Sequence, residues 1–203
     1  MITTPSFSKE RVRIRGYVTA EVSRLQKGYL TGSSRSRADI SHLRRSIGKP
    51  LGSDPTILPL VVDAAAVEST LDVPTYAENA ILGALSLYAL HQQSQTRGMH
   101  VEGIRFGSAL SHIRIDGGNE RQGVVRRFDG VMTASTLPET LRKARGLVQL
   151  LKQAEQPLDY GLFAEDLYRL QSPYSAAGVR LRWGRDFYRT QSTHDSHNEG
   201  DKQ

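Results

Sequence analysis

The clearest chemistry in the sequence lies in four polar residues with helical spacing: Arg142, Arg145, Gln149 and Lys152. They stand at i, i+3, i+7 and i+10, so on an α-helix they form one polar stripe beside an apolar one. Cations in such a line can contact successive phosphates of a nucleic acid backbone. A solvated helix surface has the same pattern, so the stripe indicates polyanion binding only together with other basic segments.

Further cations border the apolar stripes of other predicted helices. Arg121 lies in angular register with the apolar stripe of its helix, whereas Arg126 and Arg127 point to two other sides. In an earlier helix Arg44 borders the apolar stripe and Arg45 faces outward. No single helix face carries all of these cations, so a basic surface must be assembled between helices.

Positive charge is concentrated in two parts of the chain, whose net charge is +6. Residues 1–50 carry 11 positive and 3 negative charges, and residues 101–150 carry 8 and 5. Residues 51–100 between them carry 1 positive and 5 negative charges. Two basic segments around an acidic one indicate a polyanionic partner, most often nucleic acid.

The residue patterns of catalysis and of metal binding are absent from the sequence. Leu43 stands where a P-loop that ends at Gly48 would need its first glycine. The histidines are scattered, there is no cysteine, and no G-x-S-x-G motif occurs. Glu165 and Asp166 lack a partner arrangement for acid–base chemistry and are predicted to be solvated helix surface. We therefore expect no catalytic residue, no metal ligand and no cofactor.

The elements that position these residues are predicted to be helices, because apolar residues recur with the helical period and no run alternates strictly. The expected helices cover residues 17–30, 36–47, 57–67, 75–93, 104–114, 119–132, 136–156, 159–172 and 174–190. The predicted fold class is all-α, with about nine helices in a compact bundle or in two small packed helical subdomains.

Local signals support several of these helices. Ser36, with Asp39 three residues later, predicts one N-terminus, and Thr75 with Glu78 predicts a capping box at another. Residues 80–90 are apolar nearly all round, which predicts a central and fully packed helix. Asp159 is the predicted N-cap of a later helix.

The predicted domain organisation has three parts. Residues 1–16 form a basic N-terminal segment, residues 17–190 form the helical domain, and residues 191–203 form a disordered polar tail. No apolar run approaches the about 18–20 residues that span a bilayer, and no signal-peptide core is visible. Together with the absence of cysteine, this composition predicts a cytoplasmic protein without a membrane partner.

The last predicted helix contains VRLRWGRDFYR, residues 179–189, in which arginines alternate with aromatic residues. On a helix, Trp183 and Phe187 share one narrow face and the arginines lie on another. We therefore predict that Trp183 and Phe187 are core anchors and not platforms for stacked bases, with Leu181 and Tyr188 partly buried.

Several segments together resemble the CasB family, the small subunit of Cascade, the type I-E CRISPR surveillance complex. These are LRRSIGKPLGSDP, ALSLYALHQQSQTRGMH, NERQGVVRRFDGVMTA, QPLDYGLFAEDLY and RWGRDFYR. They occur in the family's order and spacing across residues 44–189. The resemblance implies a non-enzymatic, all-helical subunit that pairs with a second copy of itself. It also implies contact with the guide-RNA-bearing backbone subunits and a position near the large subunit.

The resemblance further implies that the protein holds guide RNA, target DNA and the displaced strand, and so stabilises the R-loop. Because exchange of a DNA duplex for a guide–target duplex is nearly balanced, modest backbone contacts can tip it. Gln122 stands where family members often have a second arginine, and Arg126 or Arg127 is a candidate replacement. The predicted nucleic-acid contacts are Arg44, Arg45, Arg105, Arg121, Arg126, Arg127, Arg142, Lys143, Arg145 and Lys152.

Two other classes of protein are weaker interpretations of the sequence. A helix-turn-helix regulator needs a short turn before a recognition helix, and no such turn is evident in the sequence. A nuclease or RNA-processing enzyme needs catalytic or metal-binding residues, for which no motif is present.

Overall fold

The computed structural model describes residues 4–62, 72–113 and 118–195 of the 203-residue chain. In chain order the elements are α1 (Thr4–Leu30), α2 (Ser34–Arg45), the 3₁₀ helix η1 (Pro55–Leu60), α4 (Tyr76–Gln92), α5 (Phe106–Ser111), α6 (Gly118–Met132), α7 (Leu137–Gln153), α8 (Tyr160–Leu170) and α9 (Pro173–Asp195). Within these ranges there is no β-strand, only an isolated bridge between His100 and Leu158. The all-α prediction is confirmed.

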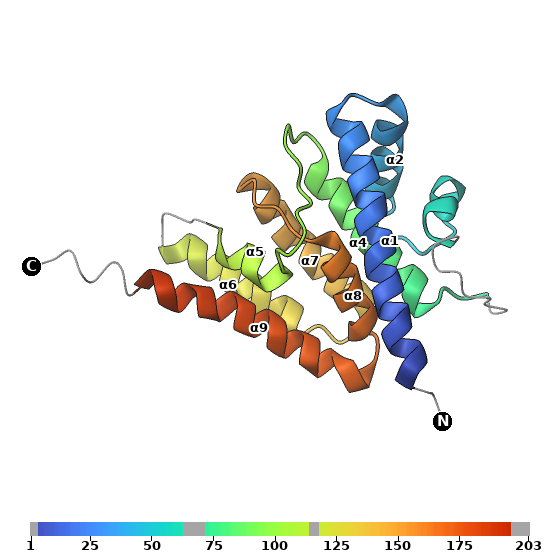
Figure 1. Ribbon diagram of the computed structural model, residues 1–203. Coiled ribbons are helices and arrows are strands. Elements are labelled where there is room, and N and C mark those ends of the chain that lie inside the picture. Colours follow the sequence, from blue (N-terminus) through green and yellow to red (C-terminus); the bar gives the residue numbers. More distant parts are fainter. Residues whose placement is uncertain (1–3, 63–71, 114–117, 196–203) are drawn as a thin grey trace, which may run out of the picture.

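Helix α4 is the centre of the structure, as its composition predicts. Every residue from Ala80 to Gln92 is buried, and α1, α2, α7 and α8 pack around the helix. Its N-terminus has the predicted capping box, in which Thr75 accepts from the backbone N–H of Glu78 and Glu78 accepts from that of Thr75. Figure 1 shows α4 passing behind α1, with α5, α6 and α9 grouped on the other side of α7 and α8.

Helix α1 begins at Thr4 and not at Tyr17 as predicted. The apolar stripe continues one turn earlier to Ile14, which is buried, although the arginines around it conceal the pattern. The predicted boundary between residues 1–16 and residues 17–190 therefore lies inside one continuous helix. The first part of that helix is a basic surface with α8 packed against it.

The predicted start of α2 at Ser36 is wrong. Ser33 is the N-cap and accepts from the backbone N–H of Ser36, whose own side chain is buried. Ser36 lies against Gly28 of α1, where a Cβ atom would collide with the Ser36 hydroxyl. A close approach of two helices at a glycine therefore determines the role of this serine, and the sequence pattern alone cannot distinguish it from a cap.

Two other predicted helices differ from the structure. Residues 57–67 were expected to form a short buried helix, but the described part is the 3₁₀ helix η1, and residues 63–67 lie outside the described ranges. The last helix extends to Asp195, beyond the predicted end at residue 190. The rest of the predicted disordered tail, residues 196–203, lies outside the described residues.

The aromatic residues of α9 are core anchors, as predicted. Trp183 and Phe187 are each 1% exposed; the Trp183 ring centroid lies 4.8 Å from that of Phe106, and Phe187 stacks on Phe128 at 4.2 Å. Leu181 and Tyr188 are exposed, so the prediction that they are partly buried is wrong. All helices from α1 to α9 contribute buried side chains to one continuous hydrophobic core.

Candidate nucleic-acid interface

A shallow polar groove lies between α6, α7 and the C-terminal end of α4. It is lined by Leu90, Gln95, Arg127, Gly146, Gln149, Leu150, Lys152, Gln153 and Glu155. Gly146 leaves the α7 backbone open at this point, because nothing lies within 4 Å of the position of a Cβ atom. A ligand backbone could therefore approach α7 closely beside the two groove cations, Arg127 and Lys152.

Arg44 adds a third cation to this surface from α2. Its Nη1 donates to the Gln93 side-chain oxygen at 2.8 Å, which fixes the half-buried guanidinium at the end of α4. Burial lowers the pKa of Lys152, and the positive charge of Arg44 lowers it further. Two cations from different helices thus raise the local positive potential, which a phosphate placed between them would relieve.

The loop after α4 holds these elements together. The Gln95 side chain donates to the backbone oxygen of Lys152 at 3.0 Å, and Tyr29 of α1 accepts from the backbone N–H of Ser94 at 2.9 Å. Ser94 itself has a φ of 63°, a left-handed conformation that turns the chain between the two glutamines. No sequence motif predicts a role for Gln93 or Gln95, and the one signal is their place in the ALHQQSQ segment at the end of a buried helix.

Arg45 and Lys143 are cations already engaged by side chains of their own helices. Arg45 donates to Ser41 at 2.9 Å and approaches His42 Nδ1 at 3.0 Å. Lys143 forms an ion pair with Glu139 at 2.7 Å. Both would have to exchange these partners in order to contact a phosphate, so their charges are less available than that of Arg127.

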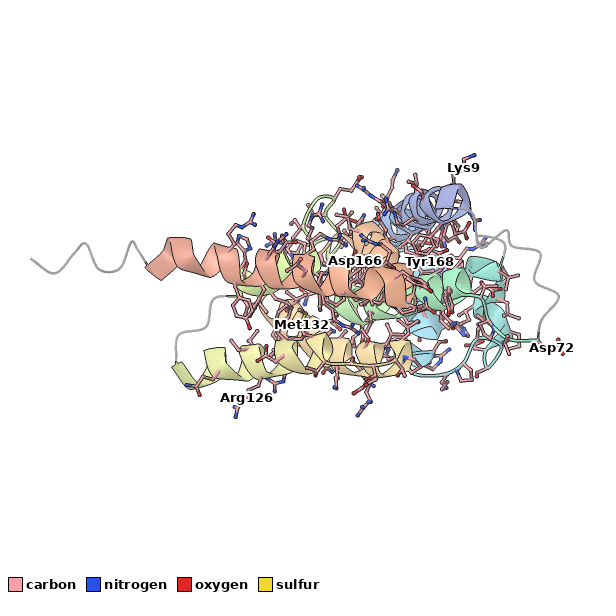
Figure 2. The ribbon with its side chains drawn as sticks, turned by 90° about the horizontal axis from the view of Figure 1, so that it is seen from below. Lys9, Asp72, Arg126, Met132, Asp166 and Tyr168 are labelled. Atoms are coloured by element: carbon pink, nitrogen blue, oxygen red, sulfur yellow. The ribbon has the colours of Figure 1, made fainter. Side chains whose placement is uncertain are left out.

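The predicted stripe on α7 is only partly assembled into the groove. Gln149 and Lys152 line the groove, whereas Arg142 and Arg145 are exposed on the outer surface of α7. Arg126 is likewise exposed on α6 and points away from the body of the molecule in Figure 2. These arginines can extend a basic track beyond the groove.

Arg121 and Arg105 are not brought to the groove by any described contact. Arg121 belongs to α6, but its side chain lies outside the described part of the structure. Arg105 precedes α5 and lines a different groove between α1 and α8. Arg44, Arg127 and Lys152 therefore form what we call the α2–α6–α7 surface, and Arg105 lies outside it.

The prediction that Glu165 and Asp166 are solvated surface is wrong for Asp166. Asp166 is 6% exposed and accepts from Trp183 Nε1 at 2.6 Å and from Arg182. Burial raises the pKa of Asp166, and Arg182 and the Trp183 N–H oppose this effect. Glu165 forms an ion pair with Arg11 at 3.1 Å. Both acids thus hold helices together.

Among the residues that can be described, no three histidine or acidic side chains gather closely enough to hold a metal ion. None of the described helices is long and apolar enough to cross a lipid bilayer. The turn between α1 and α2 is as short as that of a helix-turn-helix, although no such turn is evident from the sequence. However, in the first turn of α2, where such a protein would contact bases, Ser36 is buried against α1.

Comparison with solved structures gives consistent matches. CasB from Thermobifida fusca is 32% identical with a TM-score of 0.72, and the match covers 86% of this chain and 97% of that one. CasB from Thermus thermophilus is 25% identical with a TM-score of 0.62 over the same shares of the two chains. A chain of a CRISPR RNA-guided surveillance complex has the same fold at 21% identity, with a TM-score of 0.67 over 91% of this chain and 99% of that one.

Sequence comparisons agree with the structural ones. No curated protein sequence matches the chain significantly. The sequence profile of the CRISPR-associated protein Cse2 matches residues 39–188, which begin within α2 and end within α9. The chain therefore belongs to the Cse2 family, which is the CasB family that its sequence resembles.

Proposed function

We propose that this chain is the small subunit of a type I-E Cascade surveillance complex and that it contributes no catalytic residue. In the cytoplasm of its host it pairs with a second copy and contacts the backbone and large subunits. It holds guide RNA, target DNA or the displaced strand through their phosphates and so stabilises the R-loop. Membership of the Cse2 family supports the assembly, and the α2–α6–α7 surface supports the nucleic-acid contact.

The observation that carries the proposed nucleic-acid contact is that Arg44, fixed by Gln93, comes from α2 to the end of α4, where Arg127 and Lys152 line the groove. The three cations come from separate helices, and the pKa of Lys152 is lowered in part by Arg44. Like charges that converge in this way favour an anionic ligand between them, which supports the proposed contact. Contacts to phosphates carry no sequence preference, which suits a complex whose guide RNA reads the target.

The test compares the triple variant R44A/R127A/K152A with a control, K27A/R35A/R37A, that removes three exposed cations elsewhere. For the isolated protein and a single-stranded DNA oligonucleotide, the slope of log K against log salt concentration should become shallower by about 2, at roughly 0.7 per lost contact. In the reconstituted complex the triple variant should shorten the R-loop lifetime, and the control should not. An unchanged salt slope and an unchanged R-loop lifetime would contradict the proposed site.

A further inference from the structure

A second charged groove lies between α1, α8 and the segment that leads into α5. It has a volume of about 610 Å³. Its charged lining consists of Arg11, Arg15, Arg105, Arg169 and Arg182 with Glu102, Glu165 and Asp166. In Figure 2, α1 with Lys9 and α6 with Arg126 lie at opposite edges of the molecule. The α1 groove is therefore separate from the candidate nucleic-acid interface.

Two of its five arginines are paired within the groove. Arg11 lies 3.1 Å from Glu165, and Arg182 forms an ion pair with Asp166. No described carboxylate forms an ion pair with Arg15, Arg105 or Arg169. Glu102 is the only other acid in the lining, so the groove keeps an excess of positive charge.

The excess of positive charge in the groove acts on Arg169. Burial lowers the pKa of its guanidinium, and the charges of Arg182 and Arg11 add to the effect, whereas Asp166 and Glu165 oppose it. The Nε atoms of Arg169 and Arg182 are buried and have no hydrogen-bond acceptor among the described residues. Because like charges surround Arg169, an anionic group from outside that offsets them would stabilise this arrangement.

The mixture of charges indicates which kind of anion fits. A nucleic acid carries a negative charge at every nucleotide, and such a backbone would be pressed against Glu102 and Glu165. A peptide can place its carboxylates only against the arginines. It can also cover apolar surface, and Val12 on the groove wall is 63% exposed.

We propose that the α1 groove docks an acidic segment of a neighbouring protein subunit, whose carboxylates pair with Arg15, Arg105 and Arg169. This inference rests on the proposed association with other Cascade subunits, but not on the path of the nucleic acid. The wall formed by α1 lies outside the 39–188 segment matched by the family profile, so family membership alone does not assign it.

The test uses the full chain titrated into a reconstituted complex that lacks this subunit. The variant R15E/R105E reverses two exposed charges of the groove, and R35E/R37E reverses two exposed charges at the start of α2 as a matched control. We expect R15E/R105E to weaken incorporation into the complex at least tenfold, measured by native mass spectrometry, and R35E/R37E to change it less than twofold. Both variants should keep the helical circular dichroism of the parent.

Binding of the isolated chain to a DNA oligonucleotide separates this proposal from the previous one. R15E/R105E should bind the oligonucleotide as R35E/R37E does, because the two variants have the same net charge. Normal incorporation of R15E/R105E would overturn the docking proposal and leave the α2–α6–α7 surface unaffected. A selective loss of oligonucleotide binding by R15E/R105E would also overturn it and would assign the groove to nucleic acid.

Discussion

Arg44 donates a hydrogen bond to the side-chain oxygen of Gln93 across 2.8 Å, which ties the last turn of α2 to the end of α4. An arginine held in this way loses less conformational entropy when it binds a phosphate than one that moves freely in solvent. Because Gln93 is neutral, it fixes the guanidinium without cancelling its charge. Besides burial, the positive charge of Arg44 therefore also lowers the pKa of Lys152.

Replacement of Gln93 should affect nucleic-acid binding in two distinguishable ways. Gln93→Ala releases Arg44 and should weaken binding to an oligonucleotide by about three- to tenfold, the effect of one immobilised side chain. Gln93→Glu keeps Arg44 in place but neutralises it, so binding should weaken further and become less dependent on salt. Fluorescence anisotropy at several salt concentrations measures both effects.

The exposed glutamine Gln122 on α6 provides the control for Gln93. Gln122→Ala should leave both the affinity and its salt dependence within twofold of the parent. If Gln93→Glu bound the oligonucleotide as tightly as the parent, Arg44 would not contact phosphate.

Gly146 offers a test of the groove that does not remove a charge. Since nothing lies within 4 Å of the position of its Cβ atom, Gly146→Ala should raise the free energy of unfolding by about 0.5–1 kcal/mol through helix propensity. Gly146→Glu should keep most of that stability but place a carboxylate in the groove, so oligonucleotide binding should fall several-fold. Urea unfolding and anisotropy measure the two effects separately; equal DNA binding by the parent and Gly146→Glu would contradict a ligand path along α7.

The features that the sequence predicts correctly depend on neighbours along the chain. The capping box of Thr75 and Glu78 and the N-cap at Asp159 require only residues within one turn. The burial of Trp183 and Phe187 follows from their shared helix face. In each case the helical period itself places the interacting groups.

The features that the sequence does not predict depend on contacts between helices. An aspartate such as Asp166 is usually expected on the surface. Here its carboxylate accepts from Trp183 and Arg182, and only the packing of α8 on α9 brings these groups together. The partnership of Arg44 with Gln93 joins positions 49 residues apart. Single-helix geometry indicated that any basic surface must be assembled between helices, but it could not choose which cations would meet.

Buried histidines should make the protein sensitive to mild acid. Complete burial lowers the pKa of His91 to about 3, and burial also lowers that of His100. In the unfolded chain both would bind a proton near pH 6.5, so below that pH the unfolded state binds more protons than the folded state. The free energy of unfolding should therefore be constant above about pH 7 and fall as pH decreases, by up to about 1.4 kcal/mol per pH unit for each histidine.

Urea unfolding between pH 7.5 and 4.5 measures this dependence. His91→Gln keeps a polar group near the Tyr160 hydroxyl, which lies 3.0 Å from His91 Nδ1, but cannot take up a proton in this range. Its stability should consequently vary less with pH than that of the parent. The same slope in both proteins would show that His91 is not the group responsible.

Adjacent acids on α8 should differ sharply in their contribution to stability. Asp166→Asn removes the charge that Arg182 and Trp183 share in a nearly buried position, and it should lower the free energy of unfolding by about 2–4 kcal/mol, somewhat below a fully buried pair because Arg182 is 27% exposed. Glu165→Gln breaks a more exposed ion pair with Arg11 and should cost less than about 1 kcal/mol. Thermal and urea unfolding of the two variants test this difference, since they change the same charge one position apart. Equal destabilisation would mean that Asp166 contributes no more than a surface ion pair and that α9 is held on α8 by its aromatic packing alone.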